Sequence, residues 1–315
     1  MSNLDVRPPV TLCGGSGDVL SAPAFDVLPP RVTTLGDASV RRLLPTMGRR
    51  MVGAWCFLDH YGPDDIATSD GMQVPPHPHT GLQTVSWLLE GEIFHRDSLG
   101  SAQLLRPGTL GLMTAGSAIA HSEQSPPVHP SGLHGTQLWV ALPEGQRHRD
   151  PSWEFHAELP AWTSGGVAGT VLLGEVEGQR SPGVVHSPMV GVDLRVSGPG
   201  TVPVERDFEY AVAVVDGRVS VGGTAVPPGS LVYLGCGRRE LALSGSGRAL
   251  LLGGVPFAEK IVMWWNFVAR SGEEVVESVR AWERGDFGPV PGYDGDPLPA
   301  PRLPATPLLP RGRRG

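Results

Sequence analysis

Short apolar runs, broken every few residues by glycine or proline, make up most of the chain between residues 25 and 257. In the run LQTVSWLLEGE, polar Thr84 and Ser86 alternate with apolar Val85 and Trp87, and leucines then make both faces of the run apolar. A period of two predicts a β-strand, and short strands separated by turn residues are typical of sandwiches and barrels. We therefore expect an all-β fold.

The β-type runs fall into two blocks, residues 25–147 and 166–257, joined by a connector over residues 148–165. The second block repeats dipeptides of the first in the same order. These matches are Val74-Pro75 with Val202-Pro203, Glu90-Gly91 with Asp216-Gly217, and Pro107-Gly108 with Pro228-Gly229. A repeated strand–turn–strand unit predicts an internal duplication, with two similar β-barrels in tandem.

The two ends of the chain differ from these blocks. Residues 1–24 form an N-terminal segment, and residues 258–288 form a C-terminal helical segment. Within the latter, apolar residues at helical spacing, early acidic residues and Gly285 as a stop predict one helix over about 272–284. Residues 289–315 are rich in proline and end in RGRRG, which predicts an extended or disordered tail.

The charge and hydropathy of the chain do not suggest a nucleic-acid or membrane partner. A net charge of −7 and an isoelectric point near 5.8 do not suggest the basic face of a nucleic-acid-binding protein. No apolar run reaches the roughly 18–20 residues of a membrane span, and the start MSNLDVRPPV lacks the pattern of a signal peptide. We expect a cytoplasmic protein that binds neither nucleic acid directly nor a membrane.

Lysine and cysteine usage narrows the chemistry further. Lys260 is the only lysine, which makes Schiff-base and P-loop chemistry improbable. The three cysteines, Cys13, Cys56 and Cys236, are far apart and form no CxxC pair. This sparse set indicates a reducing compartment and no disulfide framework.

Two histidine-containing motifs carry the main chemical signal. His77 and His79 flank Pro78, and residues two apart on a strand project from the same face. In AHSEQS, His121 and Glu123 have the same spacing. If the two motifs lie on neighbouring inward-facing strands, three imidazoles and one carboxylate converge, a set close to that of non-haem Fe(II) sites. An HxH pair alone is more often a chance occurrence in a loop than a pair of ligands, but the second pair favours a metal site.

Several segments together resemble the pirin family of the cupin superfamily. They are FLDHYGP (57–63), HPHTGLQTVSWLLEGEIFHRDSLGS (77–101), RPGTLGLMTAG (106–116) and AHSE (120–123), with weaker likeness up to about residue 290. The resemblance implies two tandem cupin barrels of the jelly-roll type, with metal, usually iron, only in the N-terminal barrel. It implies the metal ligands His77, His79, His121 and Glu123. The second block has VERD (204–207) where HPH would stand, so its barrel should lack metal ligands.

The resemblance also implies an activity. Pirins of this kind act as quercetin 2,3-dioxygenases, so we expect a metal-dependent dioxygenase that uses Fe(II), or another divalent metal, with O₂. The substrate would be a flavonol or a related enediol or aromatic compound, and Glu123 would also be the catalytic base for its hydroxyl proton. The alternatives are an iron-binding, redox-sensing regulatory protein that modulates a protein partner, and a metal-free or zinc-bearing structural bicupin.

Other polar and aromatic residues have weaker assignments. His60 is either a structural turn residue or a support for a ligand, with the structural role favoured. Asp97 could orient a ligand imidazole, whereas Glu92 and His95 make a poor ligand pair. His129, His134, His148 and His156 are expected in solvated loops. Phe57, Trp87, Leu89 and Met113 are candidate walls of an apolar pocket, or plain core.

Overall fold

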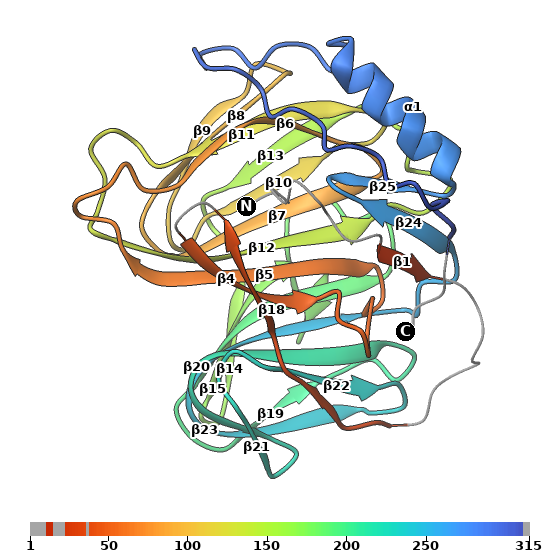
Figure 1. Cartoon of the computed structure of the whole chain (residues 1–315). Coiled ribbons are helices and arrows are strands. Elements are labelled where there is room, and N and C mark those ends of the chain that lie inside the picture. The colour runs from red at the N-terminus through yellow and green to blue at the C-terminus, as the bar shows by residue number, and fades with distance from the viewer. Residues whose placement is uncertain (1–10, 15–22, 36–37, 311–315) are drawn as a thin grey trace.

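The chain forms two β-rich domains stacked on one another, with a single helix beside the first domain (Figure 1). The computed structural model describes residues 11–14, 23–35 and 38–310. Over these residues the structure confirms a mainly β fold with two successive domains and one short C-terminal helix. The predicted basic end RGRRG and most of residues 1–24 lie outside the described residues.

The first domain consists of two facing sheets. One sheet has seven strands in the order β13-β10-β7-β12-β5-β4-β3. They are β3 (Arg31–Leu35), β4 (Ala38–Leu44), β5 (Trp55–Asp65), β7 (Leu82–Glu90), β10 (Leu110–Thr114), β12 (Gly132–Ala141) and β13 (Ser152–His156). The other has four strands in the order β6-β11-β8-β9. They are β6 (Gln73–His79), β8 (Ile93–Asp97), β9 (Ala102–Leu105) and β11 (Ile119–Gln124).

The second domain is built on a nine-stranded sheet. Its main path runs β14-β15-β18-β23-β20-β22-β2, with β19 paired to β23 and β21 paired to β20. The strands are β2 (Asp26–Leu28), β14 (Ala161–Ser164), β15 (Val167–Leu173), β18 (Met189–Val196), β19 (Gly200–Pro203), β20 (Glu209–Val221), β21 (Thr224–Val226), β22 (Leu231–Gly235) and β23 (Glu240–Gly254). A small hairpin joins β16 (Glu175–Val176) and β17 (Gln179–Arg180).

The strand pairing departs from the predicted boundaries at three places. Strand β2, from the start of the predicted first block, pairs with β22 of the second domain. Strand β13, in the predicted connector, adds to the first domain beside β10, whereas β14 adds to the second domain beside β15. Composition does not reveal which sheet edge a short strand will join, because that choice depends on backbone hydrogen bonds between distant segments.

The C-terminal segment combines strands with the predicted helix. Strands β1 (Thr11–Gly14), β24 (Lys260–Trp264) and β25 (Phe267–Ala269) form a three-stranded sheet, which the sequence pattern missed. Helix α1 (Gly272–Glu283) is close to the predicted range. The Ser271 side chain caps it by accepting a hydrogen bond from the Glu274 N–H, and Val275 and Val279 are its buried residues.

The proline-rich segment 289–310 has no helix or strand, but it packs against the protein. Val290 and Leu308 are buried in the same apolar cluster as Val275 and Val279. The Trp282 indole donates to the Leu298 carbonyl oxygen at 2.8 Å. Residues 289–310, which we expected to be extended or disordered, are therefore an irregular segment packed on the protein, because apolar residues between the prolines give the segment a surface to bury.

One apolar core continues across the contact between the domains. The Trp55 indole N–H lies 3.1 Å from the Val190 carbonyl oxygen and 3.2 Å from that of Gly253, both in the second domain. A Cβ atom at Gly191 would meet the Trp55 ring at 2.8 Å, so glycine is required for this approach. The two domains therefore hold one another in a fixed arrangement.

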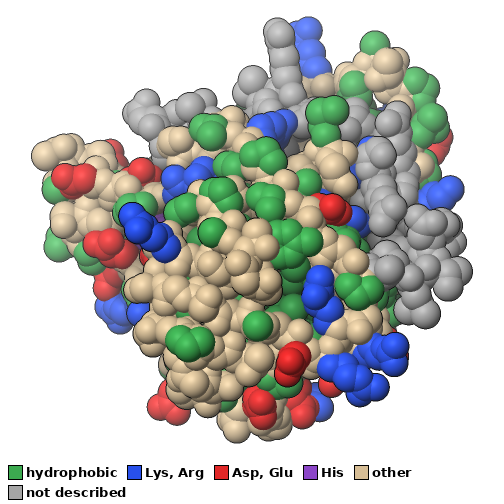
Figure 2. Space-filling view, turned by 90° about the horizontal axis from the view of Figure 1, so that it is seen from below, with side chains coloured by type: hydrophobic (Ala, Val, Ile, Leu, Met, Phe, Trp, Pro, Cys, Tyr) green, Lys and Arg blue, Asp and Glu red, His purple; other side chains and the backbone are tan. Residues whose placement is uncertain are grey.

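The face of the molecule on the side of the second domain carries charges of both signs. Figure 2 views the molecule from the side of the second domain and shows scattered acidic and basic side chains around hydrophobic and uncharged ones. Neither sign of charge covers this face. Among the described residues, no helix combines the length and the hydrophobicity that crossing a bilayer demands.

Candidate metal centre

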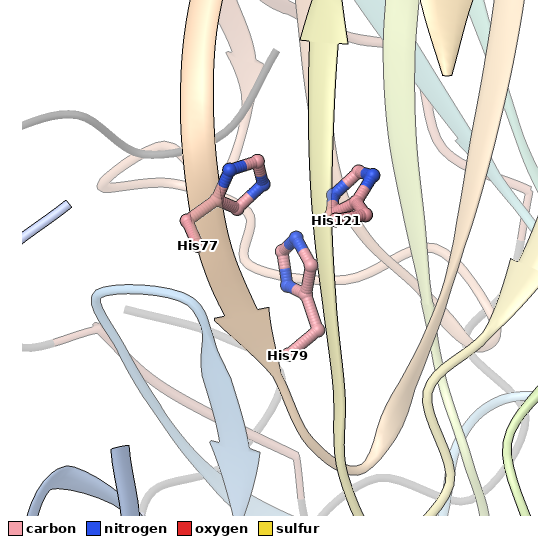
Figure 3. A group of neighbouring side chains, drawn as sticks. All are labelled: His77, His79 and His121. Atoms are coloured by element: carbon pink, nitrogen blue, oxygen red, sulfur yellow. The ribbon is translucent and has the colours of Figure 1, made fainter. Parts of the chain in front are cut away.

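Three histidines converge inside the first domain (Figure 3). His77 and His79 come from β6, and His121 comes from the neighbouring antiparallel strand β11, directly opposite His77. The ring centroids are 4.3 Å apart for His77 and His121, 5.2 Å for His77 and His79, and 5.1 Å for His79 and His121. One nitrogen from each ring lies within 4.8 Å of the other two. The three predicted imidazoles thus meet at one point.

The local sequence explains why the first motif projects as it does. Pro78 separates the two histidines and pairs with Ala120 on β11, so its own ring does not occupy the cluster. The strand ends at a tight turn through Gly81, whose φ is +71° and where a Cβ atom would lie 2.1 Å from the Val268 carbonyl oxygen. Only glycine fits there, and the turn brings strand β25 against the end of β6.

The Nδ1 atom of each histidine has its own acceptor. His77 Nδ1 lies 2.8 Å from the Pro75 carbonyl oxygen, and His79 Nδ1 lies 3.0 Å from that of Asn266. A carbonyl oxygen only accepts hydrogen bonds, so both rings carry hydrogen on Nδ1 and a lone pair on Nε2. His121 Nδ1 lies 3.4 Å from His95 Nδ1. These contacts fix the rings in the way that supporting groups orient metal-ligating imidazoles.

Burial keeps the imidazoles neutral. His77, His79 and His121 are at most 1% exposed. Burial lowers the pKa of His77 to about 4, and it lowers the pKa values of His79 and His121 well below the usual range. Neutral imidazoles are the form that binds a metal ion, so the cluster is in its binding form at neutral pH.

A further observation, at His121, supports a metal ion as the ligand of these three histidines. Among the described residues, His121 Nε2 is buried and has no hydrogen-bond partner. A buried polar atom without a partner is costly, and a cation bound by three imidazoles removes that cost. The His77, His79 and His121 side chains would hold the ion.

Glu123, the fourth predicted ligand, lies beside this group but is not one of its three members. It is 1% exposed, and a bulge on β11 separates it from the register of His121. The Ser86 hydroxyl donates to Glu123 Oε1 at 3.2 Å and also lies 3.0 Å from Gln137 Oε1. Burial, and then the Glu123 carboxylate, raises the pKa of Tyr61 well above its usual value. No separate signal in the sequence indicated Ser86, Gln137 or Tyr61.

His95 and Asp97 lie closer to the cluster than the sequence indicated. As expected, His95 and Glu92 do not form a pair, because Glu92 forms an ion pair with Arg106. Instead, His95 Nε2 lies 3.1 Å from Asp97 Oδ2, and both residues are at most 1% exposed. Asp97 therefore contacts His95, and His95 in turn contacts His121, so the hypothesis that Asp97 orients a ligand imidazole stays a prediction.

Two other predicted histidines lie away from the cluster. His60 Nε2 lies 2.7 Å from His134 Nε2, and Arg41 donates to His60 Nδ1 at 3.3 Å. Burial, followed by Arg41, lowers the pKa of His60 to about 3. His60 lies within β5 rather than in a turn, and its contacts are with His134 and Arg41. The prediction of a solvated loop for His134 is wrong, because that residue lies on β12 and is only 9% exposed.

Asn266 is the functional contact that sequence reasoning missed most clearly. It lies 187 positions after His79 in the chain. The backbone N–H of Val268 donates to the Thr80 carbonyl oxygen at 3.0 Å, which places the turn between β24 and β25 next to the HPH strand. No local pattern could indicate this contact, because it depends on a backbone carbonyl brought in by the tertiary fold.

A cavity of about 560 Å³ lies next to Trp139, and none of the three cluster histidines lines it. Phe57, Trp139, Met263 and Trp265 contribute apolar walls, and three arginines also line it. The Trp139 ring stacks on Phe57 at 4.0 Å and meets the His79 ring edge-on at 5.1 Å. Of the aromatic and apolar residues proposed as pocket walls, Phe57 is therefore one, whereas Trp87 and Met113 are core.

The second domain has no comparable cluster among its described residues. Residues 204–207, which stand where HPH stands in the first domain, follow the four-residue strand β19. The one histidine of that block, His186, is half-buried and contacts Arg149.

Family models match both domains. The model described as Pirin matches residues 37–140, and the model described as Pirin C-terminal cupin domain matches residues 189–288. The predicted two-cupin architecture is thereby confirmed.

Individual proteins agree with the family models. A Pseudomonas aeruginosa protein named "Putative quercetin 2,3-dioxygenase" is 45% identical over 275 residues, which are 85% of this chain and 87% of that protein. A Caulobacter vibrioides pirin-like protein is 36% identical over 87% of this chain and 98% of its own length. The crystal structure of a quercetin 2,3-dioxygenase from Acinetobacter baumannii superposes with a TM-score of 0.85 and 41% identity, covering 90% of this chain and 96% of that one. The chain therefore belongs to the pirin family of two-domain cupin proteins.

Proposed function

We propose that this protein is an Fe(II)-dependent dioxygenase of the quercetin 2,3-dioxygenase type. Its substrate would be a flavonol or a related enediol or aromatic compound, used together with O₂. The observation that carries the proposal is the buried group of three neutral imidazoles, each held through Nδ1. The names of the 45% and 41% identical relatives support the same reaction type.

In this proposal, four residues bind the metal ion, and one of them also accepts a proton from the substrate. His77, His79, His121 and Glu123 hold the ion, which supplies the Lewis acidity and the redox chemistry that O₂ requires. Glu123 also accepts the substrate hydroxyl proton at a carboxylate oxygen. Ser86 donates to Glu123 at 3.2 Å and keeps the carboxylate in place.

The cavity next to Trp139, the residue that also contacts His79, supports an aromatic substrate. Its volume of about 560 Å³ lies within the range of small-molecule sites, which is about 300–1,000 Å³. Aromatic side chains at its wall suit a planar ring, and the Trp139 ring is shared between the cavity wall and the contact with His79.

The test is to purify the protein in air and without oxygen, measure bound metals, and follow flavonol loss together with O₂ uptake. The proposal predicts stoichiometric iron and turnover that is abolished by His79→Ala. His129→Ala, which changes a histidine outside the cluster, is the matched control and should retain both properties.

Two results would overturn the proposal. Iron binding without turnover on any flavonol or enediol, together with a protein partner retained in only one redox state of the iron, would support the redox-sensing regulatory alternative. A protein that binds only zinc and is inert would leave the structural bicupin.

A further inference from the structure

A series of hydrogen-bonded, buried polar side chains begins at His121, on the side of the ring opposite its Nε2 atom. His121 Nδ1 lies 3.4 Å from His95 Nδ1, and His95 Nε2 lies 3.1 Å from Asp97 Oδ2. His121, His95 and Asp97 are all at most 1% exposed. The three residues come from the paired strands β8 and β11, where His121 stands directly opposite Asp97.

Asp97 and His95 are both held in place by further contacts. Asp97 Oδ1 accepts the backbone N–H groups of Leu99 at 2.9 Å and Ser101 at 3.0 Å, so the turn after β8 holds the carboxylate. The His95 ring stacks on Trp153 at 3.7 Å with an interplanar angle of 6°. Neither side chain can rotate without breaking these contacts.

The Asp97 carboxylate, at the end of the series, determines which atoms donate the hydrogen bonds and which accept them. A carboxylate accepts, so His95 donates from Nε2 and keeps a lone pair on Nδ1. His121 must then donate from Nδ1 to His95, which leaves the lone pair of His121 on Nε2. That atom is the one that is buried without a partner among the described residues.

We propose that Asp97 and His95 are positioning residues that select the metal-binding tautomer of His121. This inference rests on the proposed metal site. Asp97 acts through His95, because within the described part of the chain its side chain contacts that imidazole and the turn. The arrangement extends the pairing of a carboxylate with a metal-bound histidine by one additional imidazole.

Asp97→Asn tests the direction of the hydrogen bonds between Asp97, His95 and His121, with little change in the shape of the side chain. The oxygen of the introduced amide can still accept from the turn, but the amide nitrogen donates toward His95 Nε2. His95 must then carry hydrogen on Nδ1, and His121 must accept there and carry hydrogen on Nε2. In the metal-free protein, long-range ¹⁵N–¹H spectra of the histidine side chains should show His121 change from the Nδ1–H to the Nε2–H form.

The same substitution should weaken metal binding. Loss of a group that orients a ligand typically costs about 10–100-fold in metal affinity, and we expect this for Fe(II) measured anaerobically by competition with a chelator. The matched control is Glu154→Gln, which changes a carboxylate–imidazole contact of the same length, 3.1 Å to His156, away from the cluster. It should alter neither the His121 spectrum nor the affinity.

A double variant separates positioning from a structural effect. His95→Phe keeps an aromatic ring on Trp153 but removes the link, so adding Asp97→Asn to it should change Fe(II) affinity less than about twofold. The inference is wrong if His121 keeps its tautomer in Asp97→Asn, or if Asp97→Asn weakens binding equally in the His95→Phe background. If the unaltered protein binds no iron, the proposed function fails, whereas the histidine spectra still decide the tautomer.

Discussion

The two domains share a fold but use their interiors in opposite ways. In the second domain the core cluster of twenty buried residues is made of valine, leucine, alanine and one tyrosine. In the first domain, buried histidines, Glu123, Asp97 and Ser86 occupy the space between the sheets. Both domains therefore gain stability from apolar burial, but the first also accepts a group of buried polar side chains, which are costly unless each is paired or binds a ligand.

The difference teaches how a duplicated fold can separate stability from chemistry. The shared core around Trp55 anchors the polar domain to the apolar one. The first domain can then hold three imidazoles against one another, an arrangement that opposes protonation and could bind a metal ion. The predictions below test this division.

The largest effect is expected for a ligand in the first domain. His121→Ala should remove the bound metal and lower kcat/KM at least about 100-fold, since a Lewis acid contributes several kcal/mol and each 1.36 kcal/mol is tenfold in rate. His186→Ala, at the histidine of the second block, should leave both unchanged. Metal analysis and O₂ uptake measure the difference, and equal losses in both variants would contradict the division.

A core substitution in the second domain should affect stability rather than chemistry. Leu251 is fully buried, so Leu251→Ala should lower the free energy of unfolding by about 2–5 kcal/mol. Leu309→Ala, at an exposed position, should change it by less than about 0.5 kcal/mol. Urea unfolding gives the values. A loss of metal stoichiometry in folded Leu251→Ala would show that the domains are not separable in this way.

Acid should destabilise the metal-free protein through its first domain. The pKa of His77 is lowered to about 4, whereas an unfolded histidine binds a proton near pH 6.5. Between these values only the unfolded chain is protonated, so stability is lost as pH falls from about 6.5 to about 4, by on the order of 3 kcal/mol. Unfolding free energies measured across this range should fall less steeply in His77→Gln. An identical slope would refute the assignment.

Metal binding should stabilise the protein only when the cluster is intact. At a free metal concentration about 100 times Kd, the free energy of unfolding should rise by about 2.7 kcal/mol. Thermal unfolding with and without Fe(II) under anaerobic conditions should show the rise in the unaltered chain but not in His121→Ala. A similar rise in both would place the stabilising ion elsewhere.

The smallest effect is expected at the hydroxyl beside Glu123. Ser86→Ala removes one hydrogen-bond donor to the carboxylate and should lower kcat/KM by about 5–10-fold, as a bond of about 1 kcal/mol implies. Ser122→Ala is the matched control, because the Ser122 hydroxyl is buried without a partner among the described residues. Equal rates for the two variants would argue against a role for Ser86.

The sequence by itself determined the local features of this protein. Period-two runs predicted the strands, and the spacing around Gly285 predicted helix α1, because both patterns depend on residues close together in the chain. The spacing of HPH and the position of His121 predicted three converging imidazoles, since side chains two apart on a strand share a face. The role of Glu123 as a ligand remains a prediction.

Only the tertiary structure decided what surrounds the histidines. The Asn266 carbonyl comes from a turn 187 residues beyond His79, and the link from Asp97 to His121 passes through His95. Likewise, β2 joins the distant sheet rather than the near one. These features depend on backbone groups and on pairing between segments that are far apart in the chain. Their free energies are set by packing and hydrogen bonding in three dimensions, so no local pattern encodes them.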